Sequence, residues 1–457
     1  MIAKTVDTVQ TQYDGWKAGC ARRCITPEKP IWLYGYAGRP RFQPSRGVLS
    51  DLYADAVVLQ TGDNKPAIVV TLDLCVLRKP LAEALISRIE QATGIERERI
   101  IVNVSHTHSG PALDQEDLAG RMPMNEAERA VVTEYTHWMQ AQVAAVAAAA
   151  FADLKPSVLR YGFGKTDIMK NRRNLDDTGQ WQKMRANPEG PVDPRVPVLR
   201  IDDTNDRPRV VLFGCACHNV TLDQNNLLIS ADYAGFARTA IERTLPECQA
   251  TFITGCGADA NTEPRGGDRQ AEFAVEHGET LAKDVLQVVD GDLEPVSPTL
   301  DCADCAIELP LQAFLDRADL EKRAESKPEW KNMNARRMLN TLHNDEPLPE
   351  SYTTYISCWQ LGDTVTFLGL PGEVVSEYAL RIGDELGSRR IWVAGYSNEV
   401  FGYLPSRQIL QEGGYETRGL MPPALGYFAP EVEEVVVASA VTLARQLQRV
   451  RASATRS

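Results

Sequence analysis

The chain has 457 residues, enough for one large layered domain or for two lobes. Its formal net charge is −13 and it has no run of Lys and Arg, which argues against nucleic-acid binding because phosphate contacts need a basic surface. The N-terminus lacks an apolar secretory segment, and no stretch approaches the roughly 20 apolar residues of a membrane-spanning helix. We therefore expect a cytoplasmic protein without a stable membrane anchor.

Strands and helices alternate along the chain. Apolar, β-branched runs predict strands at 67–72, 100–104, 197–201, 210–213, 250–254, 364–370 and 391–394. Amphipathic stretches predict helices at 80–93, 125–154, 232–245, 373–386 and 429–450. This order predicts an α/β fold of layered mixed sheets flanked by helices, in one composite domain over residues 1–457. The charged segment 311–350 is poor in strand formers, and we expect it to be a helical surface insertion.

Two of the six histidines of the chain, His106 and His108, follow the predicted strand 100–104 directly. Residues two apart in an extended segment point to the same face, so both imidazoles can converge on one point. This pair, just before a Ser-Gly-Pro turn, indicates a metal site.

Polar residues also stand in the loops after four further predicted strands, where a rigid frame often carries functional groups. These residues are His218, Asp259, Asn261, Glu373, Tyr403 and Tyr415. Histidine nitrogens mixed with carboxylate oxygens are typical of a catalytic zinc site, which keeps one position open for water. Magnesium and calcium prefer ligands that are all oxygen atoms.

Each residue taken alone has an ordinary structural interpretation. A single His218 after a strand is more often a hydrogen-bonded core residue, and Glu373 is equally explained as a first-turn acid favoured by the helix dipole. Tyrosines in loops more often serve packing. Asp73, after the strand 67–72, either contacts a ligand histidine or belongs to a turn. The combination of a His-x-His pair, a third histidine and a Pro-Gly-Glu turn is what favours a metal site.

Seven motifs occur in an order that is found in a known family. They are residues 105–111 (Ser-His-Thr-His-Ser-Gly-Pro), 171–172 (Asn-Arg), the turn at 218, 230–235, 257–259, 370–373 (Leu-Pro-Gly-Glu) and 402–416. Together they resemble the catalytic domain of the neutral/alkaline non-lysosomal ceramidases, over about residues 18–416. The resemblance implies the fold of that catalytic domain.

The resemblance also implies roles for seven residues. Four would hold one zinc ion: His106, His218, Glu373 and Tyr403. Three would contact the scissile amide: His108, Arg172 and Tyr415. The spacing of twelve residues between the two tyrosines agrees with the family pattern.

Two features depart from that pattern. The family carries a serine in a Gly-Asp-Val-Ser-Pro turn, whereas Asn261 takes its place here, two residues after Asp259. A carboxamide cannot be a nucleophile, so we expect Asn261 to orient the substrate or stabilise an oxyanion. The immunoglobulin-like C-terminal domain of the ceramidases and a secretion signal are both missing from the sequence, which leads us to expect a small soluble substrate instead of a membrane lipid.

We therefore expect a zinc-dependent hydrolase that cleaves the C–N amide bond of a small N-acyl compound. Zinc would activate water, His108 would act as general acid or base, and Arg172 and Tyr415 would hold the carbonyl or a substrate carboxylate. Asp259 and Asn261 complete the candidate catalytic set. Three alternatives stay open: an esterase or lactonase, a true ceramidase, and a metal-dependent lyase or binding protein. The sequence also leaves open a homo-oligomer.

Overall fold

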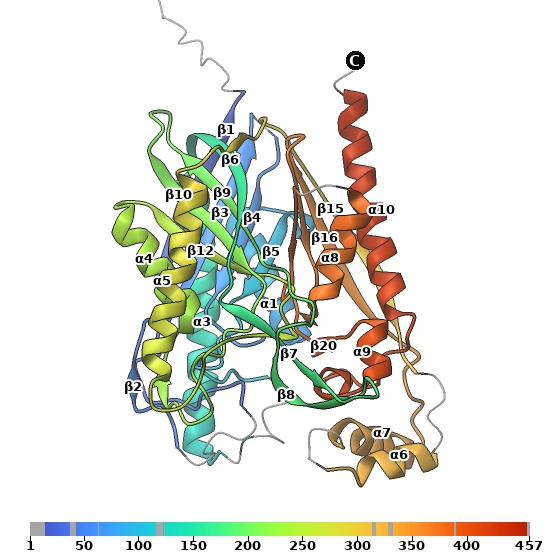
Figure 1. Ribbon diagram of the computed structural model, residues 1–457. Helices are drawn as coiled ribbons and strands as arrows, with labels where there is room; N and C mark the ends of the chain where they lie inside the picture. Colours follow the sequence, from blue (N-terminus) through green and yellow to red (C-terminus); the bar gives the residue numbers. More distant parts are fainter. Residues whose placement is uncertain are drawn as a thin grey trace, which may run out of the picture.

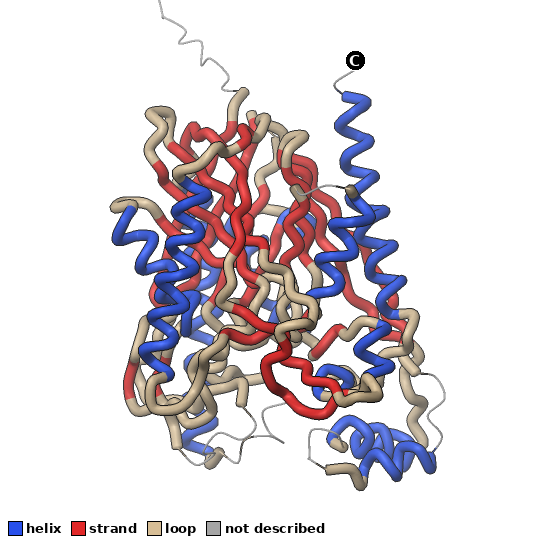
Figure 2. The backbone as a smooth tube through the Cα atoms, in the orientation of Figure 1, coloured by secondary structure: helices blue, strands red, loops and turns tan. Residues whose placement is uncertain are grey.

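Two large sheets pack face to face, and helices cover their outer faces (Figure 1). The computed structural model describes residues 14–36, 43–62, 64–115, 122, 124–312, 317–327, 332–387 and 390–454. Apolar side chains of both sheets, such as Val57 from one and Trp359 and Phe367 from the other, fill the space between them. Figure 2 shows the strands inside and the helices outside. The predicted α/β class with layered mixed sheets is confirmed.

The larger sheet has nine strands in the order β12-β10-β9-β6-β1-β3-β4-β5, with β14 beside β6. Their bounds are β1 (Trp16–Cys24), β3 (Tyr53–Thr61), β4 (Ala67–Leu72), β5 (Ile100–Val104), β6 (Lys155–Lys165), β9 (Arg195–Asp202), β10 (Pro208–Cys215), β12 (Gln249–Thr254) and β14 (Glu294–Pro295). Its outer face is covered by four helices: α1 (Lys79–Thr93) and α3 (Glu126–Ala152) over β3 to β5, and α4 (Asp232–Thr244) and α5 (Gln270–Val289) over β9, β10 and β12.

The second sheet has four strands in the order β15-β16-β17-β19, covered by α8 (Ser376–Leu386) and α10 (Val432–Ala454). The strands are β15 (Leu300–Pro310), β16 (Ser351–Leu361), β17 (Val365–Gly369) and β19 (Ile391–Ala394). Helices α6 (Arg317–Ala324) and α7 (Met333–His343) lie between β15 and β16 in the chain and project below the body in Figure 1. Among the described helices, none is long and apolar enough to cross a membrane.

Short elements surround one end of the two sheets. They are β2 (Gly47–Val48) with β11 (Leu228–Ile229), the three-stranded sheet of β13 (Ala260–Thr262), β7 (Met169–Leu175) and β8 (Trp181–Asn187), the pair β18 (Glu373–Val374) and β20 (Tyr403–Leu404), α9 (Arg407–Glu412), and the 3₁₀ turns η1 (Arg97–Arg99) and η3 (Tyr415–Thr417).

Three βαβ units build the frame of this end. The strand pairs β4/β5, β10/β12 and β17/β19 are parallel, and each is joined through one helix, α1, α4 or α8. The carboxyl ends of the three pairs meet, since isolated bridges join Asn103 to Ser397 and Gly255 to Ala394. Loops at the carboxyl ends of parallel strands are the usual place for ligand sites in α/β proteins.

One predicted boundary was wrong in a way that matters for the site. The helix expected at 373–386 begins only at Ser376, because Glu373 and Val374 pair in parallel with Tyr403 and Leu404. The Glu373 N–H donates to the Gly402 carbonyl at 2.8 Å. Gly372 precedes this pair with φ of 84°, a left-handed conformation that glycine adopts without strain. Glu373 is therefore a strand residue and not a first-turn acid.

The Asn103 side chain joins the three units. Its Nδ2 donates to the Gly395 carbonyl at 2.7 Å, and its Oδ1 accepts from the Thr254 N–H at 2.9 Å. Asn103 is fully buried, and its carboxamide supplies the acceptor of the Thr254 N–H, whereas the Gly395 carbonyl also accepts from the Ser397 hydroxyl at 3.0 Å. Because His106 is three residues further along, this contact also places the first predicted metal ligand relative to the other two units.

We expect the substitution Asn103→Leu to lower the free energy of unfolding by about 2 kcal/mol, because the buried Thr254 N–H loses its acceptor and the Gly395 carbonyl keeps only the Ser397 hydroxyl as donor. The shift in the urea midpoint measures this effect. The matched change at the exposed Asn205, Asn205→Leu, should alter stability by less than about 0.5 kcal/mol. An unchanged midpoint in Asn103→Leu would show that the carboxamide does not hold the units together.

Candidate metal centre

Three predicted ligands, one from each βαβ unit, meet at the carboxyl ends of the strands. His106 follows β5, His218 follows β10, and Glu373 follows β17. Glu373 Oε2 lies 3.4 Å from His106 Nε2 and 3.5 Å from His218 Nε2. All three side chains are buried, and their ligand atoms lie within 4.8 Å of one another. The three groups could therefore hold one ion between them.

Backbone carbonyls orient both histidines. His106 Nδ1 lies 2.7 Å from the Cys75 carbonyl, and His218 Nδ1 lies 2.9 Å from the Gly257 carbonyl. A carbonyl only accepts, so each Nδ1 carries a proton and each Nε2 is turned toward Glu373. This is the usual second contact of metal-ligand histidines. Asp73, one candidate for this role, instead pairs with Arg238 and accepts from the Tyr53 N–H.

Tyr403 completes the predicted ligand set through the β18–β20 pair. Because Tyr403 lies opposite Glu373 in that pair, its hydroxyl reaches the same centre, 3.3 Å from His218 Nε2. Arg172 Nη2 donates to this hydroxyl at 3.0 Å. Burial raises the pKa of Tyr403 well above its usual value, although the cation of Arg172 opposes this effect, so the phenol is neutral without a metal.

In the metal-free state, the three atoms that face the centre, His106 Nε2, His218 Nε2 and Glu373 Oε2, carry one proton in addition to the protons on the two Nδ1 atoms. Burial opposes ionisation of Glu373, but the His106 and His218 side chains hold its pKa well below the usual range. Burial also disfavours a charged His106, yet Cys75 and the Glu373 carboxylate raise its pKa to about 10. Burial and the Arg172 cation lower the pKa of His218 to about 3. Glu373 is thus a carboxylate, His218 is neutral, and His106 is protonated at neutral pH.

The donor set fits a zinc ion. Glu373 Oε2 is buried, and its contacts with the two imidazole Nε2 atoms, at 3.4 and 3.5 Å, are too long for strong hydrogen bonds, so a cation between the three atoms would stabilise the carboxylate. Two imidazole nitrogens, one carboxylate oxygen and a nearby phenol match the mixed N and O ligands of catalytic zinc sites, which leave a position open. The site does not offer the oxygen-only ligands that calcium and magnesium favour.

His108 lies beside the centre, with Nε2 at 3.1 Å from His106 Nε2. The ring of Tyr36 packs edge-on against its imidazole at 4.6 Å between centroids. Gly35 lies so close that a Cβ there would come within 2.5 Å of the His108 ring, so this position requires glycine. The loop at 35–36 therefore fixes the His108 imidazole next to the ligands without making it part of the Glu373 cluster.

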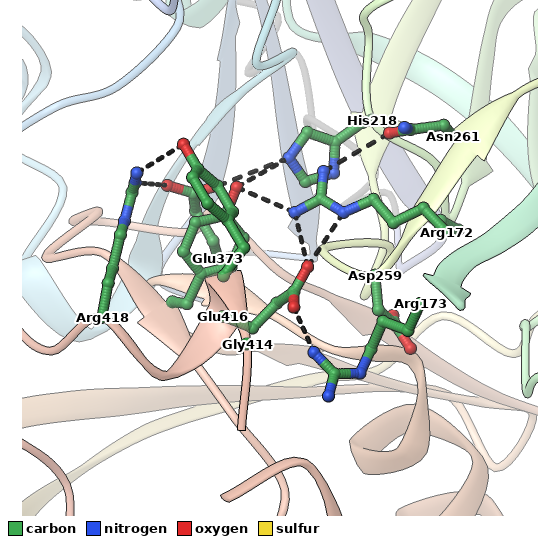
Figure 3. A network of polar contacts seen from close by, with 12 residues as sticks. Arg172, Arg173, His218, Asp259, Asn261, Glu373, Gly414, Glu416 and Arg418 are labelled. Atoms are coloured by element: carbon green, nitrogen blue, oxygen red, sulfur yellow. Dashed lines mark hydrogen bonds and ion pairs between the residues drawn. The ribbon is translucent and has the colours of Figure 1, made fainter. Parts of the chain in front are cut away.

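Arg172 belongs to a buried ion-pair network with Glu416 (Figure 3). Its Nε and Nη2 lie 3.0 and 2.9 Å from Glu416 Oε1, and Nη1 lies 3.4 Å from Asn261 Oδ1. Glu416 also pairs with Arg173. Asn261 thus faces the Arg172 guanidinium, while Tyr415 packs its ring against Tyr403 at 5.5 Å between centroids.

Asp259 lies away from the ligand atoms. Its Oδ1 accepts from the N–H and the hydroxyl of Ser376, both at 2.8 Å, and its Oδ2 accepts from Asn171 Nδ2 at 3.1 Å. Its backbone carbonyl accepts from the Arg172 N–H at 2.8 Å. These contacts join the start of α8 to β7, so Asp259 positions Arg172.

Several residues of this centre were not anticipated from the sequence. They are Glu416, Arg173 and Arg418, the carbonyls of Cys75 and Gly257, and Tyr396, whose ring lies 4.6 Å from that of His106. Arg172 and Arg173 pair with Glu416 across more than 200 residues, so no local pattern shows these two pairs. The two adjacent arginines of β7, Arg172 and Arg173, were the one local feature that could have suggested buried ion pairs.

Comparison with known proteins agrees with this geometry. The family model described as neutral/alkaline non-lysosomal ceramidase, N-terminal, matches residues 16–306, more than half of the chain. The chain belongs to this family. The resemblance seen in the sequence motifs is therefore confirmed.

Individual members of the family are distant from this one. Neutral ceramidase B of Dictyostelium discoideum is 26% identical over 212 residues, which cover 45% of this chain and 28% of that relative. A crystal structure of neutral ceramidase from Pseudomonas aeruginosa aligns with a TM-score of 0.73 at 18% identity, over 95% of this chain and 75% of that one. A ceramidase complexed with C2 aligns with a TM-score of 0.72 at 17% identity, with the same coverage. At these identities the structural matches show a shared fold.

We predict that metal binding releases a proton. The raised pKa of His106, about 10, means that its Nε2 holds a proton at neutral pH that a metal must displace. Apparent zinc affinity should therefore rise with pH, by up to about tenfold per unit between pH 6.5 and 8.5. Calorimetry in buffers of different ionisation enthalpy counts the released protons. We expect one proton to be released per metal ion if Tyr403 stays neutral, and two if Tyr403 binds as a phenolate. Release of no proton would contradict the protonation state of His106.

We further predict about one zinc ion per chain in the purified protein. His106→Ala and Glu373→Gln should each reduce the bound zinc to below about a tenth of that amount, since each removes a donor atom from the cluster. Elemental analysis after gel filtration measures this. The matched control is His137→Ala, because His137 is exposed on α3. Equal zinc content in all four proteins would place the metal elsewhere.

Proposed function

We propose that this protein is a zinc-dependent amidohydrolase that cleaves the C–N amide bond of a small, soluble N-acyl compound. The observation that carries this proposal is the buried group of His106, His218 and Glu373 at the carboxyl ends of three parallel strand pairs, with His108 directly beside it. Membership in the ceramidase family supports an amide as the bond that is cleaved. Ceramides themselves remain among the substrates to be tested.

A zinc ion bound here would polarise the substrate carbonyl and make water acidic enough to attack at neutral pH. His108 Nε2 lies close enough to the ligand atoms to take a proton from the attacking water. The same imidazole then delivers this proton to the leaving nitrogen, which must be protonated to depart as an amine. The packing of Gly35 and Tyr36 keeps His108 in place for both transfers.

The arginine and tyrosine side chains would stabilise the charge that develops on the carbonyl oxygen. Arg172 is buried, and burial alone would lower its pKa. Tyr403 and Glu416 outweigh this effect and raise the pKa well above its usual value, so the guanidinium is charged. It acts through the Tyr403 hydroxyl, to which it donates. Asn261 contacts the same guanidinium and helps to orient it. Fixed donors of this kind lower the barrier because they need no reorganisation during the reaction.

We predict that the zinc-loaded protein releases amine from a panel of N-acyl compounds faster than it releases alcohol from matched esters. His108→Ala should lower kcat by about 10² to 10⁴-fold and keep the zinc, because the lost group moves protons and does not bind the metal. Arg207→Ala, at an exposed loop position, is the control. Full activity in both His108→Ala and Glu373→Gln would contradict the mechanism, and a preference for the esters would make the protein an esterase.

A further inference from the structure

We propose that Arg418 binds an anionic group of the substrate, so that the preferred N-acyl compound is negatively charged. This inference rests on the proposed amide hydrolysis and names its substrate class. Arg418 stands at the edge of the metal centre, next to Glu373 (Figure 3). Its guanidinium lies over the rings of Tyr403 and Tyr415, at 4.8 and 4.6 Å from their centroids.

The hydrogen-bonding capacity of Arg418 is largely unused. Its Nη1 donates to the Tyr415 hydroxyl at 2.6 Å, and its Nη2 lies 3.7 Å from Glu373 Oε1, beyond hydrogen-bonding distance. Its Nε is buried without a hydrogen-bond partner among the described residues. A guanidinium offers five donors in a planar fork that matches a carboxylate or a phosphate. The edge formed by Nε and Nη2 therefore lacks a strong acceptor.

Arg172, the arginine expected to hold a substrate carboxylate, differs from Arg418 in this respect. Its Nε and Nη2 both contact Glu416, its Nη2 also donates to Tyr403, and its Nη1 contacts Asn261. Glu416 therefore already neutralises its charge. Arg418 has only the longer contact with Glu373, at 3.7 Å, and Glu373 is also a predicted metal ligand.

Arg418 is slightly more exposed than the other charged side chains of the centre. Its side chain is 11% exposed, compared with 5% for Arg172 and Glu373 and 1% for Glu416. Tyr415 is also partly exposed, whereas Tyr403 is buried. Of the two arginines at the centre, Arg418 is thus the one with more contact to solvent.

The charges at the centre would favour an additional anion once a divalent cation is bound. Glu373 is the carboxylate nearest to Arg418, and it is also the carboxylate that would hold the metal. A metal ion there would take this countercharge away from a guanidinium that has little access to water. An unbalanced buried cation is costly, and an anionic group of the substrate would restore the balance. Neutral substrates would leave Arg418 uncompensated.

Two pairs of probes, each with a charged and a neutral member, test this proposal. N-Benzoylglycine and N-benzoylglycinamide carry the difference on the amine side, and N-benzylsuccinamic acid and its neutral primary amide carry it on the acyl side. We expect the wild type to prefer the anionic member of at least one pair by about 30-fold in kcat/KM, the size of a charge-assisted contact. Arg418→Met should abolish most of this preference, and Arg418→Lys should keep part of it. Arg207→Met is the matched control.

Binding provides a second readout that is independent of turnover. In a His108→Ala background, the dissociation constant of the preferred anionic probe, measured by calorimetry, should rise at least about tenfold on adding Arg418→Met, whereas Arg207→Met should leave it unchanged. Equal kcat/KM for the charged and neutral members, or a preference that survives Arg418→Met, would overturn the role of Arg418 and leave amide hydrolysis standing. If no probe and no other N-acyl compound is cleaved, the proposed function fails, and the binding constants alone decide the role of Arg418.

Discussion

The arrangement of the whole centre depends on one buried carboxamide. Asn103 links the ends of β5, β12 and β19 through the Thr254 N–H and the Gly395 carbonyl, where the apolar contact between the two large sheets ends. Hydrogen bonds between Val102 and Asn398 join β5 to the loop after β19 as well. Hydrophobic packing sets how closely two sheets approach but has little directionality. Hydrogen bonds do have direction, so this contact aligns the loops that carry the three candidate ligands.

Burial determines the charges that the side chains of the centre carry. Water solvates the candidate ligands only weakly. The pKa values of His106, His218 and Glu373 therefore depend mainly on each other and on nearby charged groups such as Arg172 and Arg418. In such surroundings, electrostatic interactions are stronger than in solution, and an unpaired group is costly. The same property that favours one divalent cation therefore also restricts which substrates can complete the charge balance.

The sequence predicts the strand-end residues well and the surrounding contacts poorly. His106, His108, His218 and Glu373 were found because each follows an apolar strand in a recognisable motif. The parallel pairing of Glu373 with Tyr403 was missed, because Pro-Gly-Glu before an amphipathic run resembles a helix start and nothing local shows the partner strand.

Other parts of the fold and the site lacked a local signal altogether. The strands β15 and β16 were missed because their pattern on either side of α6 and α7 is mixed, with polar and small residues between the apolar ones. From the sequence, Asp73 was expected either to contact a ligand histidine or to belong to a turn. Neither interpretation included its partner Arg238, which is distant in the chain. Contacts between residues far apart in the chain decide such cases.

The short stretch from Tyr415 to Arg418 has an evolutionary consequence. Within four consecutive residues it supplies the ring of Tyr415, the carboxylate of Glu416 and the cation of Arg418 to the centre. This turn lies outside both large sheets. With the proposed role of Arg418, changes in this turn would alter which compounds bind, while the histidines that follow the sheet strands would stay the same. In such a scaffold, substrate preference could change without changes to the candidate metal ligands, which would favour the evolution of new substrate classes on the same fold.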